Sequence, residues 1–254
     1  MFTAHALAVA MAVALPFTKT DGPIRERLRE LKPSPPAPEK TLAKAIEVLA
    51  ETEQSMKSGI PEHLMGKAEG VVVIPDTVKA GFIVAGRGGH GVALVRGKDG
   101  LWGDPTFVNL GGVSFGPQLG VQATDLVLVF KSKKTLERIL DGKGKVTLGV
   151  DAGVAAGPVG RRAEAGTDAQ FKAEVLSYSK TRGLFAGVSM DGGVLDHASE
   201  ANRQFAKQPT KEALQAAENL KAKLLEMGGV KADKDKPALP PAVIPDSPPV
   251  KKDK

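Results

Sequence analysis

The sequence contains no cysteine and few aromatic residues. Among its 254 residues, one is Trp, one is Tyr and nine are Phe. The absence of cysteine excludes disulfides, thiol nucleophiles and thiolate metal sites. Because so few rings are available to stack on bases, we expect no nucleic-acid partner. The four histidines are not arranged at metal-ligand spacings, so we expect neither a metal nor a cofactor.

Glycine and proline are abundant, with 29 Gly and 18 Pro. From Gly70 to Leu195, short β-branched runs are interrupted by glycine, which inside strands is typical of bends and bulges. The pattern predicts an α+β fold: a strongly curved antiparallel, Gly-rich β-sheet, or a partly closed barrel, with flanking N- and C-terminal helices. The expected strands are Val71–Ile74, Gly81–Ala85, Val92–Val95, Phe107–Leu110, Leu126–Phe130, Val146–Val150, Glu174–Ser179 and Leu184–Met190.

Three helices are expected around this sheet. Thr41 can cap the first, whose opposite face carries charges of both signs, so it suits packing on a core better than lying on a membrane. The second is a short helix over Lys133–Leu140. Thr210 can cap the last, which Gly228 closes. The expected apolar positions are Leu42, Ile46, Leu49 and Met56 in the first helix, and Leu214, Ala217, Leu220, Leu224 and Met227 in the last.

The N-terminal segment resembles an export signal. Ala4–Leu15 is apolar but shorter than the roughly 20 residues that span a bilayer, and it contains an A-x-A cleavage pattern. This predicts a signal peptide over residues 1–19 and an exported, periplasmic or extracellular, membrane-peripheral protein. The residues before it include no Lys or Arg, and a cytoplasmic location is the alternative where the segment is not a signal peptide.

Composition also divides the rest of the chain. Residues 20–39 form a charged, Pro-rich linker, and residues 231–254 form a Lys/Pro-rich tail that we expect to be disordered because it cannot bury a core. A folded domain is expected over residues 40–206, followed by an amphipathic C-terminal helix over residues 207–230.

Two short motifs invite an enzymatic interpretation. Gly86–Gly91 matches G-x-G-x-x-G, but strand-like sequence follows it where a dinucleotide site needs a helix, so we interpret it as a hairpin turn. Ser114 lies in a G-x-S-x-G motif, and Asp125 and His197 follow in hydrolase order. The nucleophile elbow requires a strand, a sharp turn and a helix, so Ser114 fits a turn hydroxyl better.

Four stretches carry a resemblance to a known family. They are GFIVAGRGGHGVALVRGKDGLWGDPTF (Gly81–Phe107), GVQATDLVLVF (Gly120–Phe130), GVDAGVAAGPVGR (Gly149–Arg161) and RRAEAGTDAQFKAEVLSYSKTRGLFAGVSMDGGVL (Arg161–Leu195). In this order they resemble the SYLF domain. The resemblance implies a non-enzymatic domain that binds anionic, phosphoinositide-like headgroups at a membrane surface and that is actin-associated in some eukaryotic members.

Basic residues at strand ends and turns are the candidate lipid contacts. The formal net charge is +6, which favours an anionic partner without selecting one. Arginine offers planar multidentate donors for phosphate. These residues would form one anion-binding face if the strand ends shared a rim of the sheet, and scattered solubilising charge is the alternative. The candidates are Arg161, Arg162, Lys131, Lys133, Lys134, Lys143, Lys145, Lys180 and Arg182.

Three functions therefore remain to be compared. The first is a lipid-binding domain whose partner is an anionic phospholipid membrane. The second is a structural or protein-interaction scaffold, actin-binding-like as in eukaryotic relatives, that recruits partners through its Pro-rich tail. The third and most remote is a serine hydrolase that uses Ser114.

Overall fold

The computed structural model describes residues 36–54, 59–81, 84–115, 120–142, 144–159, 170, 172–181, 184–188 and 192–229. The expected signal peptide and C-terminal tail lie outside the described residues. The elements are α3 (Pro38–Gln54), α4 (Glu62–Gly66), β1 (Gly70–Gly81), β2 (Val84–Val95), β3 (Thr106–Phe115), β4 (Gly120–Phe130), α5 (Lys134–Leu140), β5 (Val146–Thr147), β6 (Val154–Ala156), β7 (Val175–Thr181), β8 (Leu184–Gly187), β9 (Gly193–His197), α7 (Ser199–Lys207) and α8 (Lys211–Met227).

The described strands form one sheet in the order β5-β9-β3-β2-β1-β4-β7-β6, and β8 also pairs with β7. Neighbouring strands are antiparallel except β6 and β7, which are parallel. The two ends of this order, β5 and β6, are joined by a short connection in which Leu148 bridges Ala152. The sheet therefore curls strongly into a half-barrel, as the Gly-rich sequence predicts, although it is mixed and not purely antiparallel.

Each face of the sheet carries its own hydrophobic core. Val71 and Val73 of β1 belong to the core on the outer face, which α3, α7 and α8 cover. Val72 and Ile74 belong to the core on the inner face of the curl. Because successive strand residues point to opposite faces, a strand buried on both sides shows a continuous apolar run in the sequence.

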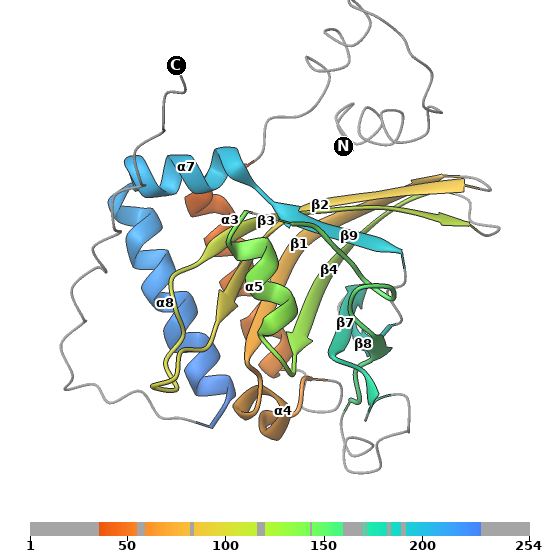
Figure 1. Cartoon of the computed structure of the whole chain (residues 1–254), viewed down its shortest axis with the longest axis horizontal. Helices are drawn as coiled ribbons and strands as arrows, with labels where there is room; N and C mark the ends of the chain where they lie inside the picture. Colours follow the sequence, from red (N-terminus) through yellow and green to blue (C-terminus); the bar gives the residue numbers. More distant parts are fainter. Residues whose placement is uncertain are drawn as a thin grey trace, which may run out of the picture.

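Short helix α5 closes the inner core, and the longer helices lie together on the outer face (Figure 1). Leu136 and Ile139 of α5 are fully buried in the inner core. The expected helix over Lys133–Leu140 is confirmed, with its first turn beginning at Lys134. In α8, Thr210 accepts a hydrogen bond from the Ala213 N–H at 3.1 Å, which confirms the expected cap.

Two expected features of the helices are wrong. Thr41 does not cap α3, which begins at Pro38, because proline is well suited to the first helical turn. Thr41 is instead buried within the helix. Leu214 of α8 is 46% exposed, because the buried face that includes Ala217 continues one helical turn back to Ala213 and not to Leu214.

A bulge interrupts β1 at its centre. Val73 pairs with Val92 and Val78 pairs with Gly88, so β1 has one residue more than β2 over this stretch. The bulge contains Pro75, which has no N–H to donate to a neighbouring strand, and Asp76, whose φ is +48°. Aspartate tolerates this left-handed conformation better than most residues. The expected end of the first strand at Ile74 is therefore wrong, because β1 continues beyond the bulge to Gly81.

The glycine-rich motif of β2 lies against this bulge. Gly86–Gly91 is part of the strand and not a hairpin turn, which corrects the expectation from its sequence. A Cβ at Gly91 would contact the Val73 carbonyl oxygen and lie 2.9 Å from Ile74 Cα, and one at Gly89 would lie 2.8 Å from Ile74 Cγ2. Glycine is required here because the bulged backbone of β1 leaves no space for a side chain.

Three further strand expectations are corrected. Gly81–Ala85 is not a strand of its own, because Gly81 ends β1 and Val84 begins β2. Val146–Val150 is a strand only over its first two residues, because Gly149 turns the chain at a φ of +88°. Ser114 lies within β3 and not in a turn.

The SYLF-like signature contributes architecture around Tyr178. This side chain is fully buried, its hydroxyl donates to the Pro158 carbonyl oxygen at 3.3 Å, and burial raises the pKa of its phenol. A Cβ at Gly157 would contact the Tyr178 ring, and one at Gly187 would contact the Gly157 backbone. The two glycines therefore let β8 and the segment after β6 pack closely around the tyrosine.

The close approach at Gly91 predicts a large difference between two glycine variants. Gly91→Ala should lower the free energy of unfolding by about 2–3 kcal/mol, because its Cβ overlaps the backbone of β1. Gly111→Ala in β3 is the matched control: its Cβ would meet nothing within 4 Å, so a change within about 0.5 kcal/mol is expected. Urea unfolding measures both, and equal effects would contradict the proposed contact.

Candidate functional site

The strands β1–β4 continue past the two hydrophobic cores. We call residues 77–81, 84–91, 111–115 and 120–125 the sheet extension. None of its described side chains belongs to either hydrophobic core. Figure 1 shows these strands running away from α3, α7 and α8, which gather at the other side of the molecule. Most of its described residues are half-buried, and Thr77 and Gly91 are buried.

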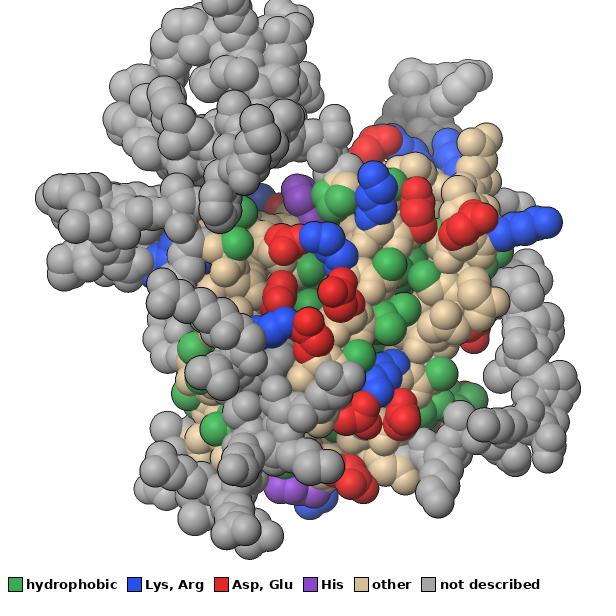
Figure 2. Space-filling model, turned by 180° about the vertical axis from the view of Figure 1, so that it is seen from behind, with side chains coloured by type: hydrophobic (Ala, Val, Ile, Leu, Met, Phe, Trp, Pro, Cys, Tyr) green, Lys and Arg blue, Asp and Glu red, His purple; other side chains and the backbone are tan. Residues whose placement is uncertain are grey.

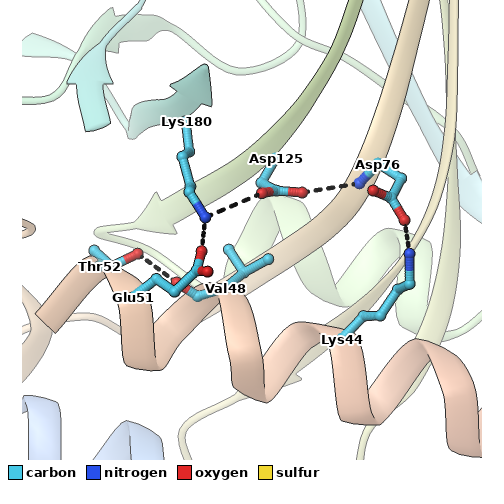
Figure 3. A network of polar contacts seen from close by, with 7 residues as sticks. All are labelled: Lys44, Val48, Glu51, Thr52, Asp76, Asp125 and Lys180. Atoms are coloured by element: carbon cyan, nitrogen blue, oxygen red, sulfur yellow. Dashed lines mark hydrogen bonds and ion pairs between the residues drawn. The ribbon is translucent and has the colours of Figure 1, made fainter. Parts of the chain in front are cut away.

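A charged network fixes the base of the extension to α3 (Figure 3). Lys44 of α3 forms an ion pair with Asp76 in the bulge, and Glu51 of α3 forms one with Lys180 of β7. Asp125 of β4 connects the two pairs, because its Oδ1 accepts a hydrogen bond from the Asp76 N–H at 3.0 Å and its Oδ2 lies 4.0 Å from the Lys180 Nζ. The network therefore ties one helix to three strands.

The Asp125–Lys180 part of this network is partly shielded from water, whereas the side chains of Lys44 and Asp76 are more than half exposed. Burial raises the pKa of its carboxyl, the Lys44 ammonium lowers it, and the Glu47 carboxylate raises it. Lys180 is similarly shielded, with 17% of its side chain exposed. Partly dehydrated charges of this kind stabilise a structure only when both partners remain in place.

A second polar row lies on the outer face of the sheet along the margin of the extension. His90 of β2 pairs with Asn109 of β3, which pairs with Asp196 of β9. The His90 Nδ1 lies 2.8 Å from the Asn109 Oδ1, at hydrogen-bonding distance. Asp196 Oδ2 pairs with Lys145 at 3.3 Å, whereas its Oδ1 is buried and has no hydrogen-bond partner.

The floor of the outer face next to this row is glycine. Gly88 of β2 pairs with Gly111 of β3, so no side chain rises from either strand at this level. Space above Gly111 is open, because a Cβ built there meets nothing within 4 Å. The outer face of the extension is therefore flat, with polar groups along its margin.

Three of the predicted basic residues lie together at the junction of β4 and α5. Lys131 follows β4, and Lys133 and Lys134 begin α5. The Lys131 N–H donates to the Glu174 carbonyl oxygen at 2.9 Å, which brings the segment containing Lys172 beside them. Their neighbours are also acidic: Lys133 pairs with Glu137, its N–H donates to Glu69, and Glu174 lies alongside.

The other described basic candidates lie elsewhere. Lys180 is held within the charged network, and its partner Asp125 lies five residues before Phe130 in β4, about 17 Å along the strand. Lys145 lies beyond the far end of α5 and pairs with Asp196. Arg161, Arg162, Lys143 and Arg182 lie outside the described residues. The described lysines therefore do not share one rim.

Charges of both signs also alternate across the face shown in Figure 2. Lys221 pairs with Asp104 and Glu218, and Lys223 pairs with Glu53 and Glu226. Interspersed ion pairs cancel each other's field at distances beyond the Debye length. This face consequently offers little long-range attraction for an anionic surface.

The residues of the hydrolase hypothesis lie far apart. His197 of β9 pairs with Val108 of β3, and Ser114 lies six residues further along β3, about 20 Å away. Asp125 is on β4, separated from β3 by two intervening strands. Ser114 also lacks the strand–turn–helix setting of a nucleophile elbow, because it lies within a strand.

In the described part of the chain, no group of three His, Asp or Glu side chains is arranged to hold a metal ion.

The charged network and the polar row were not predicted from the sequence. One signal was available for the network: Pro75-Asp76 interrupts an apolar run, and proline within a central strand indicates a bulge. The row of His90, Asn109 and Asp196 depends on strand register across three strands. No local pattern of residues contains that information.

The fold is a curled, glycine-rich sheet flanked by helices. Residues 111–225 match the Ysc84 family, described as "Las17-binding protein actin regulator". This match and the YSC84-like relatives confirm the resemblance to the SYLF domain. No solved structure matches the chain.

Curated relatives are found in animals and fungi. SH3 domain-containing YSC84-like protein 1 of Bos taurus is 39% identical and that of Homo sapiens 38%, each over 167 residues, or 64% of this chain and 48% of the relative. Protein YSC84 of Saccharomyces cerevisiae is 40% identical over 148 residues, or 58% of this chain and 31% of the relative. The chain thus spans about half of the animal relatives and about a third of the yeast one.

Hydropathy gives one further observation. No helix among the described residues is long and apolar enough to cross a membrane.

The charged network predicts a specific loss of stability. Lys180→Met should lower the free energy of unfolding by about 1–3 kcal/mol, because Glu51 and Asp125 would lose a shielded cation. Adding Glu51→Met should restore part of that loss. Arg203→Met is the control, since this side chain is 58% exposed in a helical pair and should change stability by less than about 0.5 kcal/mol. Similar urea-unfolding results for Lys180→Met and Arg203→Met would refute a stabilising network.

Proposed function

We propose that this domain is a non-catalytic protein-binding module whose docking surface is the outer face of the sheet extension. The observation that carries the proposal is the extension itself. Four strands continue past both cores, and no described side chain there is buried in a hydrophobic cluster. Strands that lie outside a hydrophobic core gain little from their own packing, so a partner that covers them supplies further contacts.

The outer face suits a protein partner better than a small molecule. Gly88 and Gly111 provide a flat floor, and His90, Asn109 and Asp196 provide hydrogen-bonding groups along its margin. Flat surfaces with few side chains to immobilise lose little conformational entropy on binding. The network of Lys44, Asp76 and Asp125 holds the surface in one orientation relative to α3.

The comparisons support the same class of partner. The family description names Las17 binding and actin regulation, and the names of the animal relatives record an SH3 domain. We therefore take filamentous actin as the first partner to test for this chain. The Pro-rich tail, which the scaffold hypothesis invokes, lies outside the described residues.

The second candidate function is binding to anionic phospholipid membranes. It is favoured by the cluster of Lys131, Lys133 and Lys134 at the β4–α5 junction, which Lys172 extends. Burial lowers the pKa of Lys131, and Lys134 is exposed. The exported, membrane-peripheral location predicted from Ala4–Leu15 belongs to this second proposal.

A bulky residue at Gly111 should block partner docking while the fold remains intact. Gly111→Trp places an indole on the flat floor, where space is open and a strand readily accommodates an aromatic residue. We expect at least a tenfold loss of co-sedimentation with filamentous actin, with an unchanged thermal midpoint. Gly111→Ala, which adds only a methyl group, should retain binding. Equal binding by both variants, or no binding by the unaltered chain, would overturn the actin proposal.

The lipid candidate predicts charge-dependent vesicle binding. Lys133→Glu with Lys134→Glu should weaken binding to phosphatidylglycerol vesicles by roughly 30-fold, at about 1 kcal/mol for each lysine near the surface. Binding by the unaltered chain should also fall with added salt. The control is Lys207→Glu with Lys211→Glu, the same charge change at the α7–α8 junction. Equal binding to neutral phosphatidylcholine vesicles would rule out the electrostatic mechanism.

A further inference from the structure

One edge of the sheet extension carries backbone groups that no described strand pairs. In the sheet order β4 lies between β1 and β7, and β7 pairs with β4 only from Phe130 to Asp125. Beyond Asp125, residues 120–124 of β4 keep β1 as their neighbour, and no described residue pairs with their other side. We call this free side of residues 120–124 the β4 edge. An unpaired strand edge is a template for another strand.

Hydrogen bonds at the far end of β4 show which backbone groups of the β4 edge point outward. The Phe130 carbonyl oxygen accepts from the Glu69 N–H at 3.0 Å on the β1 side, and the next N–H, that of Lys131, donates at 2.9 Å on the β7 side. Successive residues of a strand direct their backbone groups to opposite edges. The bulge adds its extra residue to β1 and not to β4, so this alternation continues along β4. Val121 and Ala123 therefore direct their N–H and C=O groups outward.

Two other margins of the sheet are covered. Where β9 ends, the side-chain amide of Asn202 takes the place of a strand beside Phe107. Its Oδ1 accepts from the Phe107 N–H at 2.8 Å, and its Nδ2 donates to the Phe107 carbonyl oxygen at 2.7 Å. The outermost strands β5 and β6 are joined by the bridge between Leu148 and Ala152. Proteins also protect edges with Lys or Pro, and residues 120–124 contain neither. The β4 edge is thus left open where these two margins are closed.

We propose that the β4 edge pairs with the β4 edge of a second copy of this chain, in antiparallel register about a two-fold axis at Gln122. In this register Val121 of each copy lies opposite Ala123 of the other. Both residues direct their backbone groups outward, so each pair exchanges both of its backbone hydrogen bonds. The contact is the same on both copies, as a two-fold dimer requires. The dimer uses the edge of the strands and leaves their outer face free, so it does not depend on docking there.

The distribution of charge favours a second copy on this edge, because identical copies bring identical charges together. Residues 120–124 carry no charge, and the neighbouring Asp125 carboxylate is held by Lys180 and by the Asp76 N–H. In the two-fold register the two Asp125 residues lie about 20 Å apart along the strands. Lys79 of β1 pairs with Gln122, so the two copies of Lys79 are separated by about 14 Å, or three strand spacings. Both separations exceed the Debye length of about 10 Å.

The size of the contact predicts a weak dimer. Gly120 of one copy comes opposite Thr124 of the other, so no side chain is added beside the end of β7. Helices α3, α7 and α8 lie on the other side of the molecule from the extension (Figure 1). Pairing over residues 120–124 buries less than the roughly 1,200 Å² of a stable complex. We therefore expect a concentration-dependent dimer with a Kd of about 10 µM or weaker.

Sedimentation equilibrium of the full chain tests the dimer. The weight-average mass should rise from 26.5 kDa towards twice that value as the concentration increases from about 1 µM to about 500 µM. Ala123→Pro removes one outward N–H from each copy and should weaken association about tenfold or more. Proline is tolerated at an edge where the N–H faces outward. Ala123→Val keeps the N–H and is the matched control, so it should associate like the unaltered chain. A mass that stays at 26.5 kDa, or equal association by the proline and valine variants, would overturn the proposal.

Single cysteines test the register independently of the proline variant, because the chain itself has no cysteine. Gln122→Cys places the two thiols opposite each other in a non-hydrogen-bonded pair, with Cα atoms about 4.5 Å apart, a distance that a disulfide spans. Ala123→Cys offsets them by two residues along the strands, with Cα atoms about 8 Å apart, which a disulfide does not span. With dissolved oxygen as the oxidant, Gln122→Cys should form linked dimers about ten times faster than Ala123→Cys. Equal rates, or faster linking of Ala123→Cys, would refute the two-fold register.

Discussion

The structure depends on the contact between the bulge of β1 and the side-chain-free surface of β2. The backbone of the bulge, from Val73 to Thr77, occupies space that side chains of β2 would otherwise fill. Gly89 and Gly91 have no side chains, so the two strands fit together. At the bulge, Asp76 adopts a left-handed conformation and forms an ion pair with Lys44 of α3. This backbone irregularity therefore adds a charged contact between the sheet and α3, whose apolar face packs in the outer core.

The same irregularity sets the chemistry of both faces of the extension. On the outer face it directs the Asp76 N–H to Asp125 and so joins β4 and β7 to the helix. On the inner face it brings Lys79 beside Arg87. A register shift of one residue requires one strained backbone conformation. It changes which residues face each other at every position of the paired strands beyond the bulge. Function and architecture therefore share one cause here.

Much of this fold can be predicted from the sequence, and the errors have a common origin. Regular periodicity predicts α5, α8 and the strand cores correctly, because a buried apolar face leaves its period in the sequence. Gly86–Gly91 is mistaken for a turn because glycine serves turns and close backbone approaches equally. Here the glycines serve a close backbone approach, because Ile74 of the neighbouring strand lies against them. The pairing of Lys79 with Arg87 was missed for the same reason, since it follows only once the bulge and the register of β1 and β2 are known.

The positions of the charged side chains say more about which ligand can bind than the net charge does. A formal charge of +6 suggests a diffuse attraction for anions, yet several described lysines face a carboxylate, as Lys133 faces Glu137 and Lys145 faces Asp196. Paired charges are nearly neutral at a distance, so the overall field selects no partner. The flat outer face of the sheet extension is distinguished by shape and not by charge, because Gly88 and Gly111 face each other there and neither carries a side chain.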